Sequence, residues 1–286
     1  MKKIDISSSA GTVADSEPQP INFRQPAYCQ TPCYAQPGCQ LYNQDCLETM
    51  QEIETGSIDL LLQDTPFGCT QNEWDIKPNF PVMWQEWERI IKDNGAMIFF
   101  GTQPFASELI LSRSALFRYD LIWYKALGTG FLNANKMPMR NHEHILIFYK
   151  QLPTYNPQKY VGKMRDKGNK GSRTTTNYGK FNPTVSRNDE YFPQSVLDFT
   201  NGDRTSESDH PTQKPLDLMR YLVRTYSNEG DLVFDGYSGS GTTAHACIKE
   251  GRKFIGSELN KEYYEKSVKR LQNAISQPEL FIGSGL

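Results

Sequence analysis

Two short segments of this sequence place a carboxylate at a tight turn directly after an apolar run. The first is Asp64-Thr65-Pro66-Phe67, which follows the run IDLLLQ at 58–63. Because proline restricts the backbone, the Asp64 carboxylate and a neighbouring carbonyl, that of Thr65, can point at one shared spot. Two acceptors there would hold both hydrogens of an amino group on a flat ring, while Phe67 stacks on the ring. Taken alone, the segment fits an Asp-Pro turn with a buried phenylalanine equally well.

The second segment is a glycine-rich loop between an apolar run and a predicted helix. Glycines let the backbone approach a ligand closely, and Glu258, at the tip of the next predicted strand, can accept both hydroxyls of a ribose. The loop lacks the Gly-Lys-Ser/Thr of a Walker loop and the third glycine of GxGxxG, so it suits an adenosyl group without a pyrophosphate. A glycine turn with no ligand is the alternative. The loop residues concerned are Asp235, Gly236, Tyr237, Ser238, Gly239, Gly241 and Thr242.

Short apolar runs of strand length recur along the chain from residue 41 onward. They stand at 58–63, 96–100, 119–124, 144–149, 231–234 and 253–258. Continuous runs of this length are typical of strands that are buried on both faces. Since helical patterns separate several of them, their order predicts an α/β fold whose mostly parallel sheet is covered by helices on both sides.

Helical spacing of apolar residues marks segments between these runs. One helix is predicted by Trp84, Trp87, Ile90 and Ile91. Two more are expected at 215–227 and 242–250, the second of them stopped by Gly251. A last helix has Asn260 as its N-cap. Its predicted apolar face consists of Tyr264, Val268, Leu271 and Ile275.

The composition limits the class of protein. With 286 residues, 37% hydrophobic and 22% charged, the chain can bury a sizeable core, which excludes a disordered tail protein and a disulfide miniprotein. No apolar run has the length of a membrane-spanning helix or the pattern of a signal peptide, and six loosely spaced cysteines fit reduced thiols. We therefore expect a cytoplasmic protein. Residues 1–40, rich in Ser, Pro and Gln, are expected to form a flexible arm.

One strongly basic tract stands out in a chain whose formal net charge is −2. Because that charge argues against a surface that is basic throughout, any polyanion must bind locally. The tract lies within 151–209, where apolar periodicity lapses and a loop-rich insertion is predicted. A solvated surface loop is the alternative interpretation. Between residues 159 and 187 the single acid is Asp166, and the basic residues of the tract are Lys159, Lys163, Arg165, Lys167, Lys170, Arg173, Lys180 and Arg187.

Together these segments resemble the S-adenosylmethionine-dependent amino-methyltransferases of DNA, which act on N6 of adenine or N4 of cytosine. The order is the permuted one, in which the catalytic motif precedes the cofactor loop. The family's Asp/Ser-Pro-Pro-Tyr stands here as Asp64-Thr65-Pro66-Phe67, and its Asp-Pro-Phe-x-Gly-x-Gly stands at 235–241, with Gly236 in place of proline. A third motif, His-Pro-x-x-Lys-Pro, occupies 210–215. The resemblance spans roughly 41–150 and 210–275.

The resemblance implies a doubly wound sheet with one antiparallel strand and a bound S-adenosylmethionine. The cofactor loop would hold this molecule, with Glu258 on its ribose and with Asp45 and Cys46 beside its adenine ring. The third motif would lie near its methionine end through His210, Thr212, Gln213 and Lys214. The implied domain order is an N-terminal arm at 1–40, a catalytic half at 41–150, a target-recognition insertion at 151–209 and a cofactor-binding half at 210–286.

The family's substrate would be duplex DNA with the target base flipped out of the stack, because a stacked and paired amine is closed to in-line attack. The basic tract would contact phosphates and read base edges. An aspartate rather than a serine at position 64 points to adenine more than to cytosine. A homodimer and a cognate restriction enzyme are partners that the resemblance allows.

The departures from the family motifs, Thr65, Phe67 and Gly236, leave alternatives open. One is N4-methylation of cytosine, and another is a DNA-binding relative that has lost the chemistry. Methylation of RNA or of a protein amide is a third, which the long basic insertion disfavours.

Other candidate clusters are assigned to packing or to the pocket wall. Cys29, Cys33, Cys39 and Cys46 contain no CxxC pair, so no metal site is expected. The run Asn141-His142-Glu143-His144 opens a strand, where alternate side chains face opposite ways, and ordinary packing is favoured. Trp74 and Asp75 follow the catalytic motif closely enough to line a base pocket.

Overall fold

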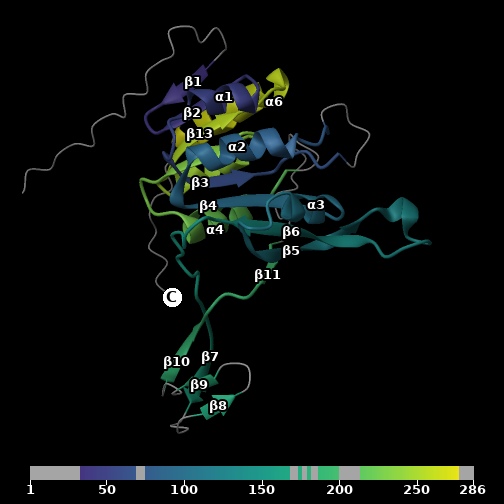
Figure 1. The fold of residues 1–286 in the computed structure, drawn as a ribbon, viewed down its shortest axis with the longest axis vertical. Coiled ribbons are helices and arrows are strands. Elements are labelled where there is room, and N and C mark those ends of the chain that lie inside the picture. Colours follow the sequence, from purple (N-terminus) through teal and green to yellow (C-terminus); the bar gives the residue numbers. More distant parts are fainter. Residues whose placement is uncertain are drawn as a thin grey trace, which may run out of the picture.

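The computed structural model describes residues 33–68, 75–167, 173–175, 179–181, 186–199 and 213–276. Nine strands of these residues form one sheet in the order β1-β2-β13-β12-β3-β4-β6-β5-β11 (Figure 1). From β2 to β4 in this order the strands are parallel, whereas β6 runs antiparallel to both β4 and β5, and β1 is antiparallel to β2. The predicted mostly parallel sheet is confirmed. The strands are β1 Cys33–Gln36, β2 Cys39–Tyr42, β3 Ile58–Gln63, β4 Ile91–Gly101, β5 Phe117–Thr129, β6 Arg140–Phe148, β11 Val196–Asp198, β12 Leu232–Asp235 and β13 Lys253–Ser257.

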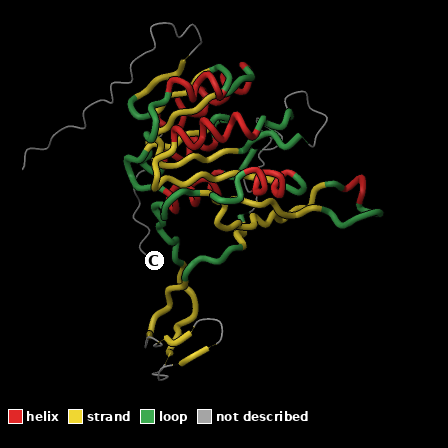
Figure 2. Tube along the Cα trace, viewed as in Figure 1, coloured by secondary structure: helices red, strands yellow, loops and turns green. Residues whose placement is uncertain are grey.

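Helices cover both faces of this sheet (Figure 2). One layer consists of α1 (Cys46–Glu52), α2 (Phe80–Ile90) and α3 (Phe105–Ser112), and the other of α4 (Leu216–Tyr226), α5 (Thr242–Lys249) and α6 (Lys261–Ser276). Side chains of β3 alternate between the layers, because Leu61 belongs to the buried cluster that contains Trp87 of α2, whereas Leu60 belongs to the cluster that contains Leu222 of α4. No helix in the described part of the chain is long and apolar enough to cross a membrane.

Two side chains of the predicted helices lie elsewhere than expected. Ile91 belongs to β4, because α2 ends at Ile90 and the chain enters the strand without a loop. Ile275 of α6 is exposed, and Ala274 is buried in its place. Ala274 follows the buried Leu271 by one helical turn, so helical geometry puts it on the same face.

The segment predicted as a loop-rich insertion contains strands, so that prediction is wrong for the described part of 151–209. β7 (Tyr160–Lys167) pairs with β10 (Ser186–Tyr191), and β8 (Arg173–Thr175) pairs with β9 (Gly179–Phe181). These small sheets project from the body of the molecule (Figure 1). An isolated pair of strands buries no apolar face, and for this reason the sequence carries no strand periodicity there.

The boundary of the predicted N-terminal arm at residue 40 is also wrong. β1 lies before it and β2 crosses it, and β2 pairs with β13 so that Cys39 and Leu41 become buried in the core. Residues 1–32 lie outside the described residues. The prolines of the segment suggested an irregular arm, whereas a four-residue edge strand and its neighbour need only the few apolar residues present here.

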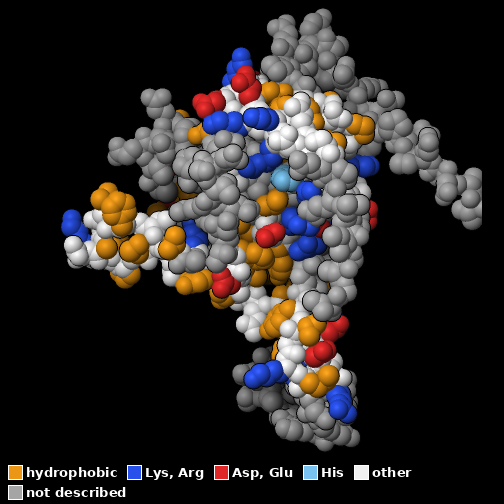
Figure 3. Space-filling view, turned by 180° about the vertical axis from the view of Figure 1, so that it is seen from behind, with side chains coloured by type: hydrophobic (Ala, Val, Ile, Leu, Met, Phe, Trp, Pro, Cys, Tyr) orange, Lys and Arg blue, Asp and Glu red, His pale blue; other side chains and the backbone are white. Residues whose placement is uncertain are grey.

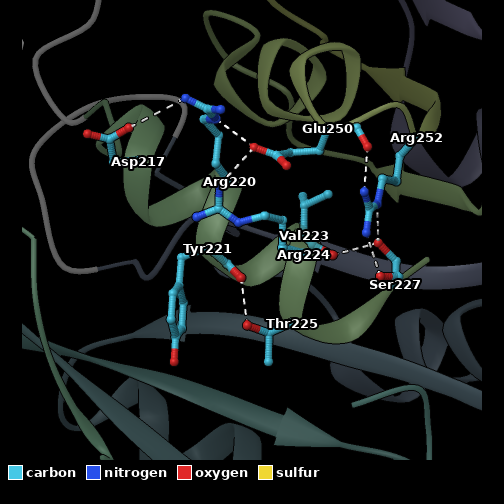
Figure 4. A network of polar contacts seen from close by, with 9 residues as sticks. All are labelled: Asp217, Arg220, Tyr221, Val223, Arg224, Thr225, Ser227, Glu250 and Arg252. Carbon is cyan, nitrogen blue, oxygen red and sulfur yellow. Dashed lines mark hydrogen bonds and ion pairs between the residues drawn. The ribbon is translucent and has the colours of Figure 1, made fainter. Parts of the chain in front are cut away.

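A polar network fastens the end of α4 to the end of α5 (Figure 4). Glu250, which follows α5, accepts hydrogen bonds from Arg220 Nε at 2.6 Å and from Arg224 Nη1 at 3.2 Å. Arg252 donates to the carbonyl of Ser227, the residue after α4, at 2.7 Å. The network fixes the direction of α4 relative to α5.

Glu250→Ala is expected to lower the free energy of unfolding by about 2 kcal/mol, because it leaves two arginines without their shared, largely buried carboxylate. Urea unfolding followed by circular dichroism measures the change. Glu262→Ala, on the exposed side of α6 where Glu262 pairs with Lys266, is the matched control and should leave stability nearly unchanged. Equal losses in both variants would contradict the role of the network.

Candidate active site

The carboxyl ends of three neighbouring parallel strands meet around one cavity of about 930 Å³. Asp64 follows β3, Asp235 ends β12 and Glu258 follows β13, and all three line the cavity. Ligands of open α/β sheets bind at this edge. The turn that begins at Asp64 and the glycine-rich loop that begins at Asp235 therefore face the same cavity.

Asp64 belongs to a cluster of two carboxylates and two lysines. Lys214 Nζ lies 2.5 Å from Asp64 Oδ2 and 3.4 Å from Glu143 Oε2. Lys125 of β5 donates a hydrogen bond to the other oxygen of Glu143. Lys214 and Glu143 are buried, whereas the Asp64 side chain is 29% exposed. A buried ammonium thus joins Asp64 to a second carboxylate, Glu143, which also lines the cavity.

Burial and neighbouring charges shift three pKa values in this cluster. Burial raises the pKa of Asp64, an effect that Lys214 opposes and Glu143 reinforces. Burial acts in the same direction on Glu143, but the ammonium groups of Lys214 and Lys125 outweigh it and hold the pKa of Glu143 below its ordinary value. Burial would lower the pKa of Lys214, yet Asp64 and Glu143 together raise it. Lys214 is therefore a cation at neutral pH.

The rest of the turn after β3 completes the cavity wall. Thr65, Pro66 and Phe67 all line it, and the Phe67 ring lies 5.0 Å from that of Phe105 in α3. The backbone N–H of Gly68 donates to Asp75 Oδ1 at 2.8 Å, which holds the end of the turn. Asp75 lines the cavity as expected, and Trp74 lies outside the described residues.

Asp235 and Glu258 hold the glycine loop from two sides. Asp235 accepts hydrogen bonds from the Tyr237 N–H at 3.0 Å and from Thr243 Oγ1 at 2.6 Å. Glu258 Oε2 accepts from the N–H of Gly239 at 2.8 Å. Burial raises the pKa of Asp235 to about 7 and also raises that of Glu258. Both carboxyl groups organise the loop while they line the cavity.

Two loop positions leave no space for a side chain. Gly241 has a φ of +80°, and a Cβ there would overlap Ser267 Oγ of α6. At Gly236 a Cβ would lie only 2.9 Å from the Cβ of Cys46. The start of α1 therefore occupies the space that the proline of the family motif would need, which explains the glycine in this chain.

The start of α1 forms another part of the cavity wall. Asp45 is the N-cap of α1, and its Oδ1 accepts from the Leu47 N–H at 2.7 Å. Cys46 is buried beside Gly236, and burial raises the pKa of its thiol to about 11. Cys46 is therefore a protonated, unreactive wall residue.

Three residues of this site were missed from the sequence. Arg270 of α6 donates to Gln213 Oε1 at 2.9 Å and to Thr242 Oγ1 at 2.9 Å, so it ties the segment before α4 to the glycine loop. Lys125 and Glu143 complete the charged cluster around Asp64. The one available signal was the His-Glu-His run at 142–144. Its glutamate lies in β6, the strand that pairs with β4.

The third motif is only partly described. His210 and Thr212 lie outside the described residues. Gln213 and Lys214 both line the cavity, and the contacts of Lys214 are with Asp64 and Glu143. The position of this motif beside the methionine end of the cofactor stays a prediction.

Two residues of the basic tract already have partners within the small sheet of β7 and β10. The Arg165 guanidinium lies 3.8 Å from the Tyr191 ring centroid and donates to Asn188 Oδ1 at 3.2 Å, and Lys159 Nζ lies 2.9 Å from Glu190. Lys163 and Arg187 are exposed. Lys170 and the side chains of Lys167, Arg173 and Lys180 lie outside what is described. DNA contact by this tract stays a prediction.

The sequence profile of the N6_N4_Mtase family, described as DNA methylase, matches residues 58–269, which is well over half of the chain. The chain belongs to this family. Members of the family are S-adenosylmethionine-dependent methyltransferases, in agreement with the resemblance found in the motifs.

Curated relatives match the DNA methylase over most of their length. DNA adenine methyltransferase YhdJ of Escherichia coli K12 is 29% identical over 246 residues, which cover 80% of this chain and 81% of the relative. Type II methyltransferase M1.MboII of Moraxella bovis is 27% identical over 249 residues, covering 80% and 94%.

Solved structures show the same fold. The M1.HpyAVI–SAM complex has a TM-score of 0.54 at 23% identity and covers 82% of this chain and 100% of that one. The PvuII cytosine-N4-specific DNA methyltransferase has a TM-score of 0.60 at 17% identity, covering 84% and 90%. The doubly wound methyltransferase fold is thereby confirmed for this DNA methylase.

Gly236→Ala is expected to weaken S-adenosylmethionine binding by about tenfold or more. The new Cβ pushes the start of α1 away from the glycine loop, so the two parts of the cavity wall no longer fit the cofactor together. Isothermal titration calorimetry with the wild type and the variant measures the effect. Gly56→Ala, at an exposed turn where the φ of +65° strains an alanine although its Cβ meets nothing within 4 Å, is the control for destabilisation away from the cavity. Unchanged affinity in Gly236→Ala would show that the contact with α1 does not restrict the side chain at position 236.

Proposed function

We propose that this DNA methylase transfers a methyl group from S-adenosylmethionine to N6 of an adenine flipped out of duplex DNA. The observation that carries the proposal is the shared cavity, in which Asp64, held by Lys214, faces the same space as the glycine loop. Methyl donor and acceptor amine can meet there without either leaving its binding residues.

The residues around the loop suit the cofactor. Glu258 can accept from ribose hydroxyls while it holds Gly239, and Asp45 and Cys46 form a wall for the adenine ring. The Ser238 hydroxyl lines the cavity, is buried and has no hydrogen-bond partner among the described residues, as expected of a group that binds a ligand. When bound, S-adenosylmethionine would supply an electrophilic methyl group, and its carbon–sulfur bond would break as the bond to nitrogen forms, which leaves a neutral thioether.

Asp64 and the Thr65 carbonyl would prepare the acceptor amine. An exocyclic amine is a poor nucleophile because its lone pair is delocalised into the ring. Two acceptors that hold its hydrogens localise the lone pair on nitrogen and stabilise the positive charge that develops as the C–N bond forms. Once charged, the amine is acidic, and the Asp64 carboxylate is placed to take the proton. Phe67 would stack on the ring.

Adenine is favoured over cytosine on two grounds. The acid at position 64 provides an anionic acceptor for the N6 amine, and the Escherichia coli relative is named a DNA adenine methyltransferase. The likeness to the PvuII cytosine-N4 enzyme, at 17% identity, concerns the fold alone.

The test is methyl transfer from labelled S-adenosylmethionine to unmethylated duplex DNA, followed by digestion and identification of the modified nucleoside. N6-methyladenine that disappears with Asp64→Ala supports the proposal. N4-methylcytosine would keep the mechanism and overturn the choice of base. Absence of product despite measurable cofactor binding would overturn the proposed function, and competition with RNA would then test the remaining substrate class.

A further inference from the structure

A long hairpin formed by β5 and β6 extends beyond the edge of the sheet where the cavity lies. Gln63, the residue before Asp64, is level with Phe99 of β4, and Gly101 at the end of β4 is level with His144 of β6. Beyond this level the hairpin continues from Ile122 to Thr129 in β5, which corresponds to about 20 Å at the rise of a strand. Figures 1 and 2 show it projecting from the body.

The tip of this hairpin is apolar and exposed. Phe131 and Leu132 are 74% and 83% exposed, and Leu127, Met137 and Met139 beside them are exposed as well. Gly130, with a φ of +89°, turns the chain into the short 3-10 helix that carries both tip residues. Figure 3, seen from behind, shows hydrophobic side chains gathered on this projection. Exposed apolar groups of this size indicate a binding surface.

The charge of the hairpin favours a polyanion as its partner. Residues 124–142 contain no Asp or Glu, whereas Lys136 and Arg140 are exposed beside the apolar tip. A base that enters the cavity beside Asp64 brings its duplex against the same edge of the sheet, where the hairpin projects. An apolar tip flanked by cations fits duplex DNA, whose phosphates lie outside and whose stacked bases lie inside.

We propose that the β5–β6 hairpin is a wedge that inserts Phe131 and Leu132 into the base stack of the duplex when the target base is flipped. This inference rests on the proposed function. Apolar side chains inserted at a base step replace the stacking that the flipped base loses, so the wedge lowers the free energy of the open duplex. The root of the hairpin carries Glu143, which contacts Lys214 beside Asp64, so the wedge and the cavity share one rigid frame.

The experiment compares wild type with the double variant Phe131→Ala/Leu132→Ala on two duplexes, after the recognition site has been mapped on methylated plasmid DNA. One duplex is fully paired, and the other lacks the base opposite the target, which makes flipping easier. The variant is expected to lose about tenfold or more in kcat/KM on the paired duplex and to recover most of it on the other. Leu152→Ala, an equally exposed leucine beyond the opposite end of β6, is the control and should match wild type.

Each other outcome counts against the wedge. Equal activity of variant and wild type on the paired duplex would overturn it. A similar loss on both duplexes, accompanied by a change from dimer to monomer in analytical ultracentrifugation, would show that the hairpin docks on a second copy of the chain. Failure of the wild type to methylate any DNA would overturn the proposed function itself. Thermal melting and S-adenosylmethionine affinity of the variant establish that it is folded.

Discussion

Lys214→Met is expected to lower kcat for methyl transfer by about 100-fold while the Kd for S-adenosylmethionine changes by less than about threefold. The variant leaves Asp64 and Glu143 without the ammonium that lies between them. Asp64 then loses both its fixed orientation and the charge that favours its ionised form. Single-turnover kinetics and calorimetry separate the two effects. A large loss of cofactor affinity would instead place Lys214 against the cofactor, as the His-Pro-x-x-Lys-Pro motif implied.

The pH profile distinguishes this role from simple destabilisation. Because Asp64 must be ionised to accept the amine hydrogens, activity falls as the pH drops through the pKa of Asp64, which burial raises above its ordinary 3.8. Without Lys214 this pKa rises further, so the acid limb of the profile moves to higher pH. Lys214→Arg should return the acid limb to its wild-type pH. Lys125→Met removes a lysine that contacts Glu143 but not Asp64, so it should move the acid limb less than Lys214→Met does. An unmoved limb in Lys214→Met would contradict the assignment.

The meeting of Asp64, Asp235 and Glu258 around one cavity could be predicted from the sequence. Each residue stands at the end of an apolar run, and carboxyl ends of parallel strands share an edge of the sheet. Local pattern and one general rule of α/β folds were therefore sufficient. The roles assigned to these side chains stay predictions, because their shared cavity shows proximity and not chemistry.

The charged partners of Asp64 could not be predicted in this way. Glu143 reaches Lys214 only because β6 is inserted antiparallel between β4 and β5, and that order is set by pairing between strands far apart in the chain. Arg270 lies on α6 at a position that the helical pattern marks only as polar. Residues whose position in the site depends on long-range register carry little local signal, which for Glu143 was the His-Glu-His run alone.

Exposed strands escaped prediction for a related reason. Apolar periodicity reports burial, and β7 and β10 pair with each other outside the core. The outer part of the β5–β6 hairpin, near Thr129 and Arg140, was likewise read only as family sequence. In this protein, the segments that project furthest from the body are those about which hydrophobic patterning says least.

The free energy of unfolding without cofactor is expected to decrease between pH 4 and pH 7 because of Asp235. Burial raises the pKa of this group from 3.8 to about 7, so the folded state binds the proton more tightly than the unfolded state in this interval. Above pH 7 the contribution is constant, and its full size is at most about 4 kcal/mol. Asp235→Asn removes the buried charge and keeps one acceptor oxygen for the Tyr237 N–H, while its amide NH2 can donate to the Thr243 hydroxyl.

The stability difference between Asp235→Asn and wild type should therefore shift in favour of the variant as the pH rises from 5 to 8. Urea unfolding at several pH values measures it. Asp217→Asn, whose side chain is 80% exposed on α4, is the control and should show no such trend. A pH-independent difference for Asp235→Asn would mean that Asp235 is already ionised at pH 5, and that the hydrogen bonds from Thr243 and Tyr237 outweigh its burial.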